Sequence, residues 1–145
     1  MKKIFIGLFA ALALLPAGAE ELKWMTDVPK AIAKAKEEKK LVLLDFTGSD
    51  WCIWCKKLQA EVFSKPEFAE YAKKNLVLVE IDFPRGKKQS AELKKANEEL
   101  QTKYKIEGLP TIIVLNGEGK KVGEAEYVEG GAKAWIAEFE KRVKK

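Results

Sequence analysis

Apolar residues gather in two nearly unbroken runs, which predict the central strands of the fold. Leu41–Phe46 is rich in Leu, Val and Phe, and only Asp45 interrupts it. Leu76–Phe83 is a second run that is again nearly all apolar. Near-continuous apolar composition is typical of strands that are buried on both faces. We therefore expect both segments to lie inside a sheet.

A second pair of strands is predicted further along the chain. Thr111–Leu115 is rich in β-branched residues, and Lys120–Val128 is a more polar run. The segment Asn116–Gly119 between them carries Asn and Gly residues, which favour a tight turn. We therefore expect these two strands to form a hairpin.

Helical spacing and capping residues predict five helices between and around the strands. Asp27 is placed to cap the first helix, whose opening turn tolerates Pro29. Ser64–Glu67 has the pattern of a capping box with a proline inside it. The predicted helices are Val28–Lys40, Cys52–Phe63, the segment from this box to Asn75, Ser90–Tyr104, and a closing helix from Gly130.

The buried faces of the last two helices follow from the same spacing. The expected inward residues are Leu93, Ala96, Leu100 and Tyr104 in the fourth helix, and Ala134, Trp135, Ile136 and Phe139 in the fifth. Strands that alternate with helices pair in parallel, whereas the final hairpin is antiparallel. The order of elements thus predicts an α/β domain of three layers.

The N-terminus has the three parts of a secretory signal peptide. Lys2 and Lys3 are the charged region, Ile4–Leu15 is an apolar run, and Pro16–Ala19 ends in an Ala-x-Ala pattern. The apolar run is twelve residues long, too short for a membrane-spanning helix. We predict a signal peptide at residues 1–19, one domain at residues 20–145, and a periplasmic or secreted mature protein.

Charge and composition exclude some classes of function. Removing the predicted signal takes away two lysines and no acids, which lowers the formal net charge from +5 to +3. The remaining charges are interspersed, and aromatic residues do not alternate with basic ones. We therefore expect no nucleic-acid binding.

The chain has two cysteines, Cys52 and Cys55, and both lie at the predicted start of a helix. Unpaired backbone N–H groups and the positive end of the helix dipole favour a thiolate there. A disulfide between them would close a short ring, and such a ring removes little entropy from the unfolded chain. The pair is therefore better suited to carrying electrons than to stabilising the fold, and we expect Cys52 to lie exposed at the helix start.

Several motifs together resemble those of thioredoxin-fold proteins. They are Asp45-Phe46, Trp51-Cys52-Ile53-Trp54-Cys55-Lys56 and Gly108-Leu109-Pro110-Thr111. The surrounding residues are most similar to an exported bacterial branch that resembles the C-terminal domain of periplasmic thiol:disulfide interchange reductases. The resemblance covers Trp24 to Val143. It implies a thioredoxin-like α/β/α fold with a mixed central sheet of four main strands and flanking helices.

The resemblance also implies roles for the site residues. Cys52 would attack a substrate disulfide as the thiolate, and Cys55 would resolve the mixed disulfide. Asp45 would serve as the base for Cys55, with a pKa raised by desolvation. The alternative for Asp45 is a carboxylate that reaches solvent or a backbone N–H at the end of its strand.

Four further residues are candidates for substrate binding. Pro110 would form a cis peptide bond, and the backbone of Leu109 would then pair with the substrate; the alternative is a trans proline that starts a strand. Trp54 would form an exposed rim that touches substrate, whereas Trp51 could instead pack in the core or shield the sulfurs. We expect Asp50 to cap the helix that follows it.

The sequence departs from ordinary thioredoxin in three ways. The link between Asp45 and Cys52 is one residue longer, and Leu78 or Glu80 stands near the place of a buried lysine. The dipeptide between the cysteines is Ile-Trp, and the chain contains no histidine. Because strong oxidants of this fold usually carry a histidine between the cysteines, we hypothesise a reductase or electron-transfer role.

Other functions stay open at this stage. An oxidase or isomerase, or a binding module with a permanent disulfide, would carry the same motifs. Two thiolates could also hold copper(I) or half a zinc site, but no Met or His ligand lies beside them. We expect no metal and no cofactor. The expected partners of this predicted monomer are substrate proteins with disulfides and a redox partner protein, such as a membrane reductase.

Overall fold

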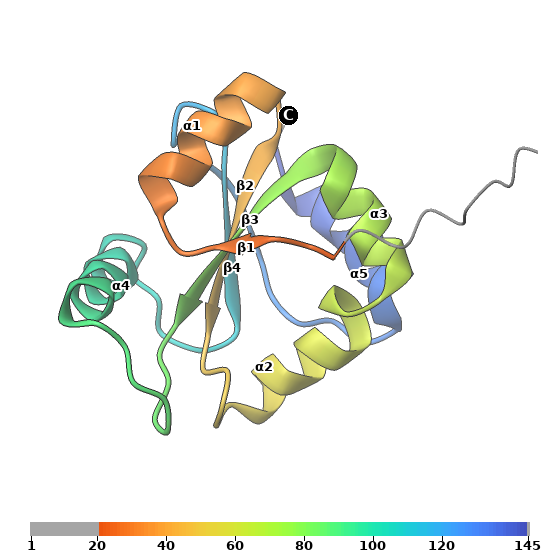
Figure 1. Cartoon of the computed structure of the whole chain (residues 1–145). Coiled ribbons are helices and arrows are strands. Elements are labelled where there is room, and N and C mark those ends of the chain that lie inside the picture. The colour runs from red at the N-terminus through yellow and green to blue at the C-terminus, as the bar shows by residue number, and fades with distance from the viewer. Residues whose placement is uncertain (1–20, 145) are drawn as a thin grey trace, which may run out of the picture.

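A computed structural model describes residues 21–144 and contains one five-stranded sheet (Figure 1). The strand order is β1-β3-β2-β4-β5, and β1 and β2 both run parallel to β3. β4 is antiparallel to β2 and to β5. The strands are β1 (Trp24–Met25), β2 (Leu41–Thr47), β3 (Leu76–Asp82), β4 (Thr111–Leu115) and β5 (Lys121–Ala125).

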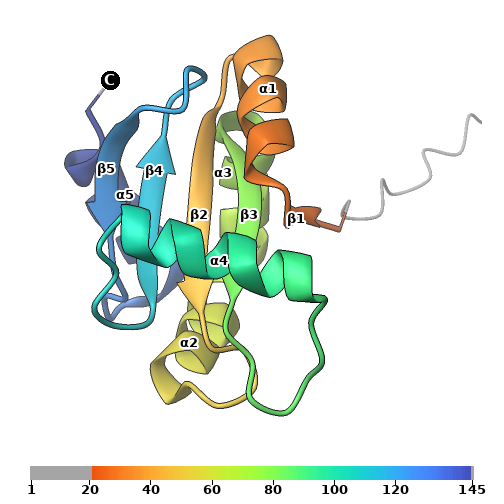
Figure 2. The ribbon, with the colours of Figure 1, turned by 90° about the vertical axis from the view of Figure 1, so that its left-hand side faces the viewer.

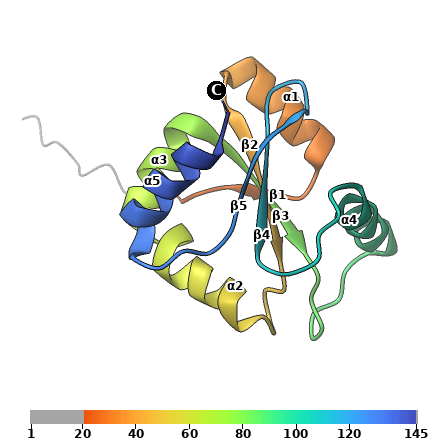
Figure 3. The same cartoon turned by 180° about the vertical axis from the view of Figure 1, so that it is seen from behind.

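Helices cover both faces of this sheet and give the three predicted layers. α1 and α4 lie on one face, and α2, α3 and α5 lie on the other (Figures 1 and 3). α4 crosses the strands obliquely, as Figure 2 shows. The helices are α1 (Val28–Glu38), α2 (Ile53–Leu58), the π-helix η1 (Gln59–Phe63), α3 (Pro66–Asn75), α4 (Ala91–Lys103) and α5 (Gly131–Arg142).

Each face of the sheet has its own hydrophobic core, because successive strand residues point to opposite faces. Val42, Leu44 and Phe46 pack with α1 on one side. Leu43 of the same strand packs with α3 and α5 on the other side, around the fully buried Phe68 and Trp135. By this alternation Asp45 shares the face of Leu43, which is also the face that α2 covers.

The structure confirms the predicted fold class and corrects several element boundaries. The lead-in at Trp24–Met25 pairs with β3 as a fifth, two-residue strand. α1 ends at Glu38, because Lys39 adopts the left-handed conformation with φ 55°. The predicted helix Cys52–Phe63 divides into α2 and a π-helix, with Cys52 as the N-cap residue of α2.

The predicted capping box at Ser64–Glu67 is wrong. Lys65 is the N-cap residue of α3, and no side chain caps this helix. The hydroxyl of Ser64 instead donates a hydrogen bond of 2.9 Å back to the carbonyl oxygen of Ala60. Pro66 still occupies the first turn, where its missing N–H is not needed.

Two predicted inward residues face solvent. Ala96 of α4 is exposed and Asn97 is buried, because the Asn97 amide donates a hydrogen bond of 3.1 Å to the carbonyl oxygen of Asp82. In α5, Ala134 is exposed and Ala132 takes the buried position. In both helices the apolar spacing identified the helix but missed part of its buried face.

The predicted signal peptide at residues 1–19 lies outside the described residues. No helix among residues 21–144 has the length and apolar character needed to cross a bilayer.

Candidate active site

A turn at the end of β2 places both cysteines at the start of α2. The N–H of Trp51 and the N–H of Cys52 donate to the carbonyl oxygen of Gly48, at 3.2 and 2.8 Å. The extended backbone of Cys52 then leads into the first residue of α2, Ile53. The turn thus brings the start of α2 to the carboxyl ends of β2 and β3, below their arrowheads in Figure 1.

Cys52 and Cys55 form a disulfide, with their Cα atoms 5.2 Å apart. Two backbone groups point at the sulfurs. The N–H of Cys55 donates to Sγ of Cys52 at 3.2 Å, and the N–H of Gly48 donates to Sγ of Cys55 at 3.5 Å. A hydrogen-bond donor aimed at a sulfur favours its anionic form. The helix start therefore supports a thiolate, as the sequence predicts.

The expectation that Cys52 lies exposed is wrong for the disulfide form. Cys52 is 7% exposed and Cys55 is 5% exposed. The side chains that reach solvent are the two between them, Ile53 at 77% and Trp54 at 53%. Ile53 and Trp54 are therefore the large apolar side chains that an approaching molecule meets beside the disulfide.

Asp45 is buried below the disulfide, and its Oδ1 atom has no hydrogen-bond partner. Burial raises the pKa of Asp45 to about 8, with further increases from the carboxylates of Glu80 and Asp82. The alternative in which Asp45 reaches solvent is therefore excluded. Its role as the base for Cys55 stays a prediction.

Glu80 stands beside Asp45 in the sheet, where it is the register partner in the parallel pairing of β2 and β3. Burial and the neighbouring Asp82 raise the pKa of Glu80 as well. A cavity of about 360 Å³ is lined by Asp45, Glu80, Cys55 and Lys56, among others. The cavity connects the two carboxyl groups with the more deeply placed sulfur.

The Leu109–Pro110 peptide bond is cis, as the resemblance implies. The carbonyl oxygen of Leu109 lies 3.8 Å from Sγ of Cys52. The hydroxyl of Thr111 donates to the carbonyl oxygen of Gly108 at 2.6 Å and closes this loop. The backbone next to Pro110 therefore borders the disulfide at Cys52.

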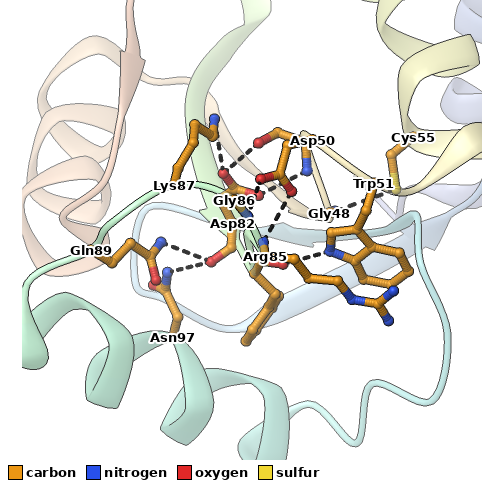
Figure 4. Close-up of polar contacts among 12 residues, drawn as sticks. Gly48, Asp50, Trp51, Cys55, Asp82, Arg85, Gly86, Lys87, Gln89 and Asn97 are labelled. Carbon is orange, nitrogen blue, oxygen red and sulfur yellow. Dashed lines mark hydrogen bonds and ion pairs between the residues drawn. The ribbon is translucent and has the colours of Figure 1, made fainter.

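Trp51 packs within the active-site turn (Figure 4). Its indole N–H donates to the carbonyl oxygen of Phe83 at 2.7 Å, and the guanidinium group of Arg85 lies 3.7 Å above its ring centre. The ring also fills the space beside Gly48, where an added Cβ would lie 2.5 Å from it. Its assignment to substrate binding stays a prediction.

Asp50 does not cap α2, contrary to the prediction. Its carboxylate oxygens accept hydrogen bonds from the N–H groups of Arg85 and Gly86, at 3.0 and 2.6 Å. These two bonds hold the pKa of Asp50 below its usual value. Asp50 therefore joins the active-site turn to the loop between β3 and α4.

A second carboxylate, that of Asp82, joins the same two loops. The sequence alone did not identify it as a site residue. Asp82 accepts hydrogen bonds from the N–H of Ser49 at 2.9 Å and from its hydroxyl at 2.6 Å. The ammonium group of Lys87 lies 3.5 Å from Asp82 (Figure 4). Parallel strands end at the same edge of a sheet, so the end of β3 could have been expected beside the end of β2.

Trp54 belongs to an aromatic group at the rim of the disulfide. Its ring centre lies 5.5 Å from that of Tyr127, and the Lys57 ammonium lies 5.1 and 5.3 Å from the two ring centres. The hydroxyl of Tyr127 donates to the Glu61 carboxylate at 2.6 Å. Tyr127 is far from Trp54 in the sequence, and no signal in the sequence pointed to this contact.

Among residues 21–144, no three histidine, cysteine or carboxylate side chains come together in a way that could hold a metal ion. The site is therefore described by its dithiol, the two carboxyl groups beneath it and the cis-proline loop beside it.

A sheet of this topology with a dithiol at a helix start defines the class of protein. The family model for the thioredoxin-like domain matches residues 28–141, and the chain belongs to this family.

The chain is also homologous to named thiol:disulfide oxidoreductases. It is 34% identical over 129 residues to the disulfide bond reductase DsbH of Chlamydia pneumoniae, an alignment that covers 89% of this chain and 77% of the relative. It is 34% identical over 101 residues to the thiol:disulfide interchange protein DsbD of Vibrio cholerae, covering 70% of this chain but 15% of that protein. A solved structure of a DsbH oxidoreductase matches with a TM-score of 0.80 at 34% identity and 88% coverage of both chains.

The close approach of Gly48 and Trp51 yields a first prediction. Gly48→Ala places a methyl group against the Trp51 ring, so we expect it to lower the free energy of unfolding by about 1–3 kcal/mol. Gly108→Ala is the matched control, because an added Cβ there meets no atom within 4 Å. Urea unfolding of the oxidised protein measures both variants. Equal losses in the two would contradict the packing described for Trp51.

The buried carboxyl group of Asp45 yields a prediction about pH. Its pKa is about 8 in the folded protein, against about 3.9 when unfolded. Between these two pH values the folded state binds this proton more tightly than the unfolded state does. The contribution of Asp45 to the free energy of unfolding is therefore greatest at low pH and falls as pH rises. This contribution falls by up to about 1.4 kcal/mol per pH unit and stops falling above pH 8.

Asp45→Asn removes this titration. We expect the variant to be more stable than the parent, by a margin that widens from about pH 4 to about pH 8 and is then constant. Urea unfolding of both oxidised proteins across this range measures the margin. A margin that is independent of pH would contradict the assigned pKa of Asp45.

Proposed function

We propose that this thiol:disulfide oxidoreductase works as an exported reductase, which passes electrons from a redox partner protein to disulfides in substrate proteins. One observation carries the proposal. The Cys52–Cys55 disulfide lies at a helix start, with the N–H of Cys55 aimed at the Cys52 sulfur. Asp45, whose buried Oδ1 has no hydrogen-bond partner, lines the same cavity as Cys55.

The reaction uses the two sulfurs in order. In the reduced protein, the Cys52 thiolate attacks a substrate disulfide, forms a mixed disulfide and expels one substrate sulfur as a thiolate. Asp45 takes the proton from the Cys55 thiol, and the resulting thiolate attacks the Cys52 sulfur. The Cys52–Cys55 bond forms, the bond to the substrate breaks, and the second substrate sulfur leaves as a thiolate. The substrate gains two electrons, and the dithiol loses them.

The charges near the sulfurs support a reducing rather than an oxidising role. The chain contains no histidine that could stabilise a thiolate between the cysteines. Asp45 and Glu80 instead line the cavity of Cys55. Carboxylates close to a thiol raise its pKa, and a less stabilised thiolate makes the dithiol a stronger reductant.

Substrate contact is assigned to the surface around Cys52. Ile53 and Trp54 are exposed large apolar side chains at the rim of the disulfide. The Leu109 carbonyl borders the Cys52 sulfur on the other side and is available to an extended peptide. We propose that a substrate segment lies between this loop and Trp54, with its disulfide over Cys52. Trp51 supports the surface from within the turn.

Export and partners are proposed from the sequence and the relatives. The charged start, apolar run and Ala-x-Ala pattern of residues 1–19 support secretion to the periplasm. Relatives named disulfide bond reductase and thiol:disulfide interchange protein support a place in a relay of dithiol exchanges. The electron donor is then another dithiol protein, such as a membrane reductase, and the domain acts as a monomer.

Reduction potential tests the proposed direction. Equilibration with glutathione buffers should give a value nearer to that of thioredoxin, about −270 mV, than to that of protein disulfide isomerase, about −180 mV. The reduced protein should also reduce insulin catalytically when a reductant regenerates it.

Cys55→Ser is the control for the insulin assay. The variant lacks the resolving thiol, so it should lose catalytic turnover while Cys52 still forms mixed disulfides. A potential at or above that of protein disulfide isomerase would overturn the reductase assignment. Full turnover by Cys55→Ser would overturn the dithiol mechanism.

A further inference from the structure

Glu80 lies where β3 becomes the edge strand of the sheet among the described residues. β1 pairs with β3 through Trp24–Leu78 and Met25–Val79 and goes no further. Glu80 is the next residue of β3, so no strand covers its outer side. On its inner side it is the register partner of Asp45. Glu80 thus stands between the buried carboxyl group and the edge of the sheet, and it is half-buried there.

No hydrogen bond or ion pair holds the Glu80 carboxylate among the described residues. The nearby ammonium of Lys87 forms its ion pair with Asp82 instead. Burial and the charge of Asp82 raise the pKa of Glu80, whereas Lys87 lowers it by a smaller amount. A half-buried acid beside a second buried acid destabilises the fold when both are ionised. The pair of Asp45 and Glu80 therefore accepts a proton readily.

Two cavities meet at Glu80. The first, of about 360 Å³, also contacts Asp45 and Cys55. The second, of about 190 Å³, lies between the end of β3 and α4 and is lined by Asp82, Lys87 and Asn97 among others. Glu80 lines both. Each cavity is lined by a residue with a buried oxygen that has no hydrogen-bond partner, Asp45 (Oδ1) for the first and Asn97 (Oδ1) for the second.

We infer that Glu80 relays the proton between Asp45 and solvent, and so resets the base after each closure of the Cys52–Cys55 bond. The inference rests on the proposed function, in which Asp45 removes a proton from Cys55. Glu80 does not contact the sulfurs and acts through Asp45. It is a positioning residue for the proton rather than a catalytic residue.

The cycle balances as three proton transfers. Asp45 takes the Cys55 proton and becomes a neutral acid. It then passes the proton to the Glu80 carboxylate and is again ionised. Glu80 releases the proton to water at the second cavity, where Asp82 and Lys87 are the charged groups that line the opening. No electron moves in these steps, and the cycle leaves both carboxyl groups as they began.

A structural role for Glu80 predicts something different. A charge at the open edge of a sheet discourages pairing with another chain, and any polar side chain of similar size would serve there. In that case Glu80→Gln would move the midpoint through the lost charge but would leave the limiting rate of repeated turnover unchanged. That limiting rate therefore separates the two roles.

The test is a single-turnover reaction of the reduced protein with an aromatic disulfide reagent that releases a coloured thiolate. The first release reports attack by Cys52, and the second reports closure of the Cys52–Cys55 bond. We expect the second rate of the wild type to rise with pH as Asp45 ionises. In Glu80→Gln the midpoint should move to lower pH by about 0.5 unit, because the adjacent negative charge is gone. Under repeated turnover, with a reductant that regenerates the dithiol, the limiting rate of Glu80→Gln should fall at least about threefold, because Asp45 must be reset between turnovers.

Two further variants complete the design. Glu124→Gln is the matched control, since Glu124 is an exposed strand residue on β5 away from the site, and it should leave both rates unchanged. Glu80→Asp keeps a carboxyl group and should retain the wild-type midpoint with a limiting rate above that of Glu80→Gln. If Glu80→Gln does not fold, Glu80→Ala takes its place, and a limiting rate of repeated turnover equal to that of the wild type would overturn the relay.

The outcomes distinguish the relay from the proposed function. Equal limiting rates of repeated turnover in Glu80→Gln and the wild type, with normal closure in both, would overturn the relay and leave the reductase standing. Failure of the wild type to release the second thiolate would overturn the proposed function itself.

Discussion

The hydrogen bond from the Cys55 N–H to the Cys52 sulfur is the contact on which the site depends. It exists because β2 ends at Thr47 and a short turn closes on the Gly48 carbonyl, which starts α2 beside the end of the sheet. Asp50 and Asp82 fix this turn to the loop after β3. The end of β2, the turn that follows it and the loop after β3 therefore hold the start of α2 in one position.

Two opposed electrostatic influences act on the dithiol. The N–H of Cys55 favours a thiolate at Cys52. At Cys55 the N–H of Gly48 acts in the same sense, but the carboxyl groups of Asp45 and Glu80 line its cavity and disfavour negative charge there. The proposed order, in which Cys52 attacks and Cys55 resolves, is consistent with this difference.

The sequence predicted the elements that depend on local chemistry. Long apolar runs identified β2 and β3, and the spacing of Cys52 and Cys55 after a polar turn identified the disulfide. The family motif also predicted the cis bond before Pro110. Contacts between distant segments were missed, because their partners are set by tertiary packing. Tyr127 beside Trp54 is one such contact, and Asp50 was misassigned because its carboxylate reaches Arg85 rather than the adjacent helix.

The pH dependence of alkylation of the two sulfurs in the reduced protein tests the central claim most directly. Mass spectrometry after brief treatment with iodoacetamide can follow each cysteine separately. The account predicts that Cys52 reacts first and at lower pH, while Cys55 stays protected to a higher pH. Equal reaction of both sulfurs, or a Cys52 that does not react in the folded protein, would contradict it.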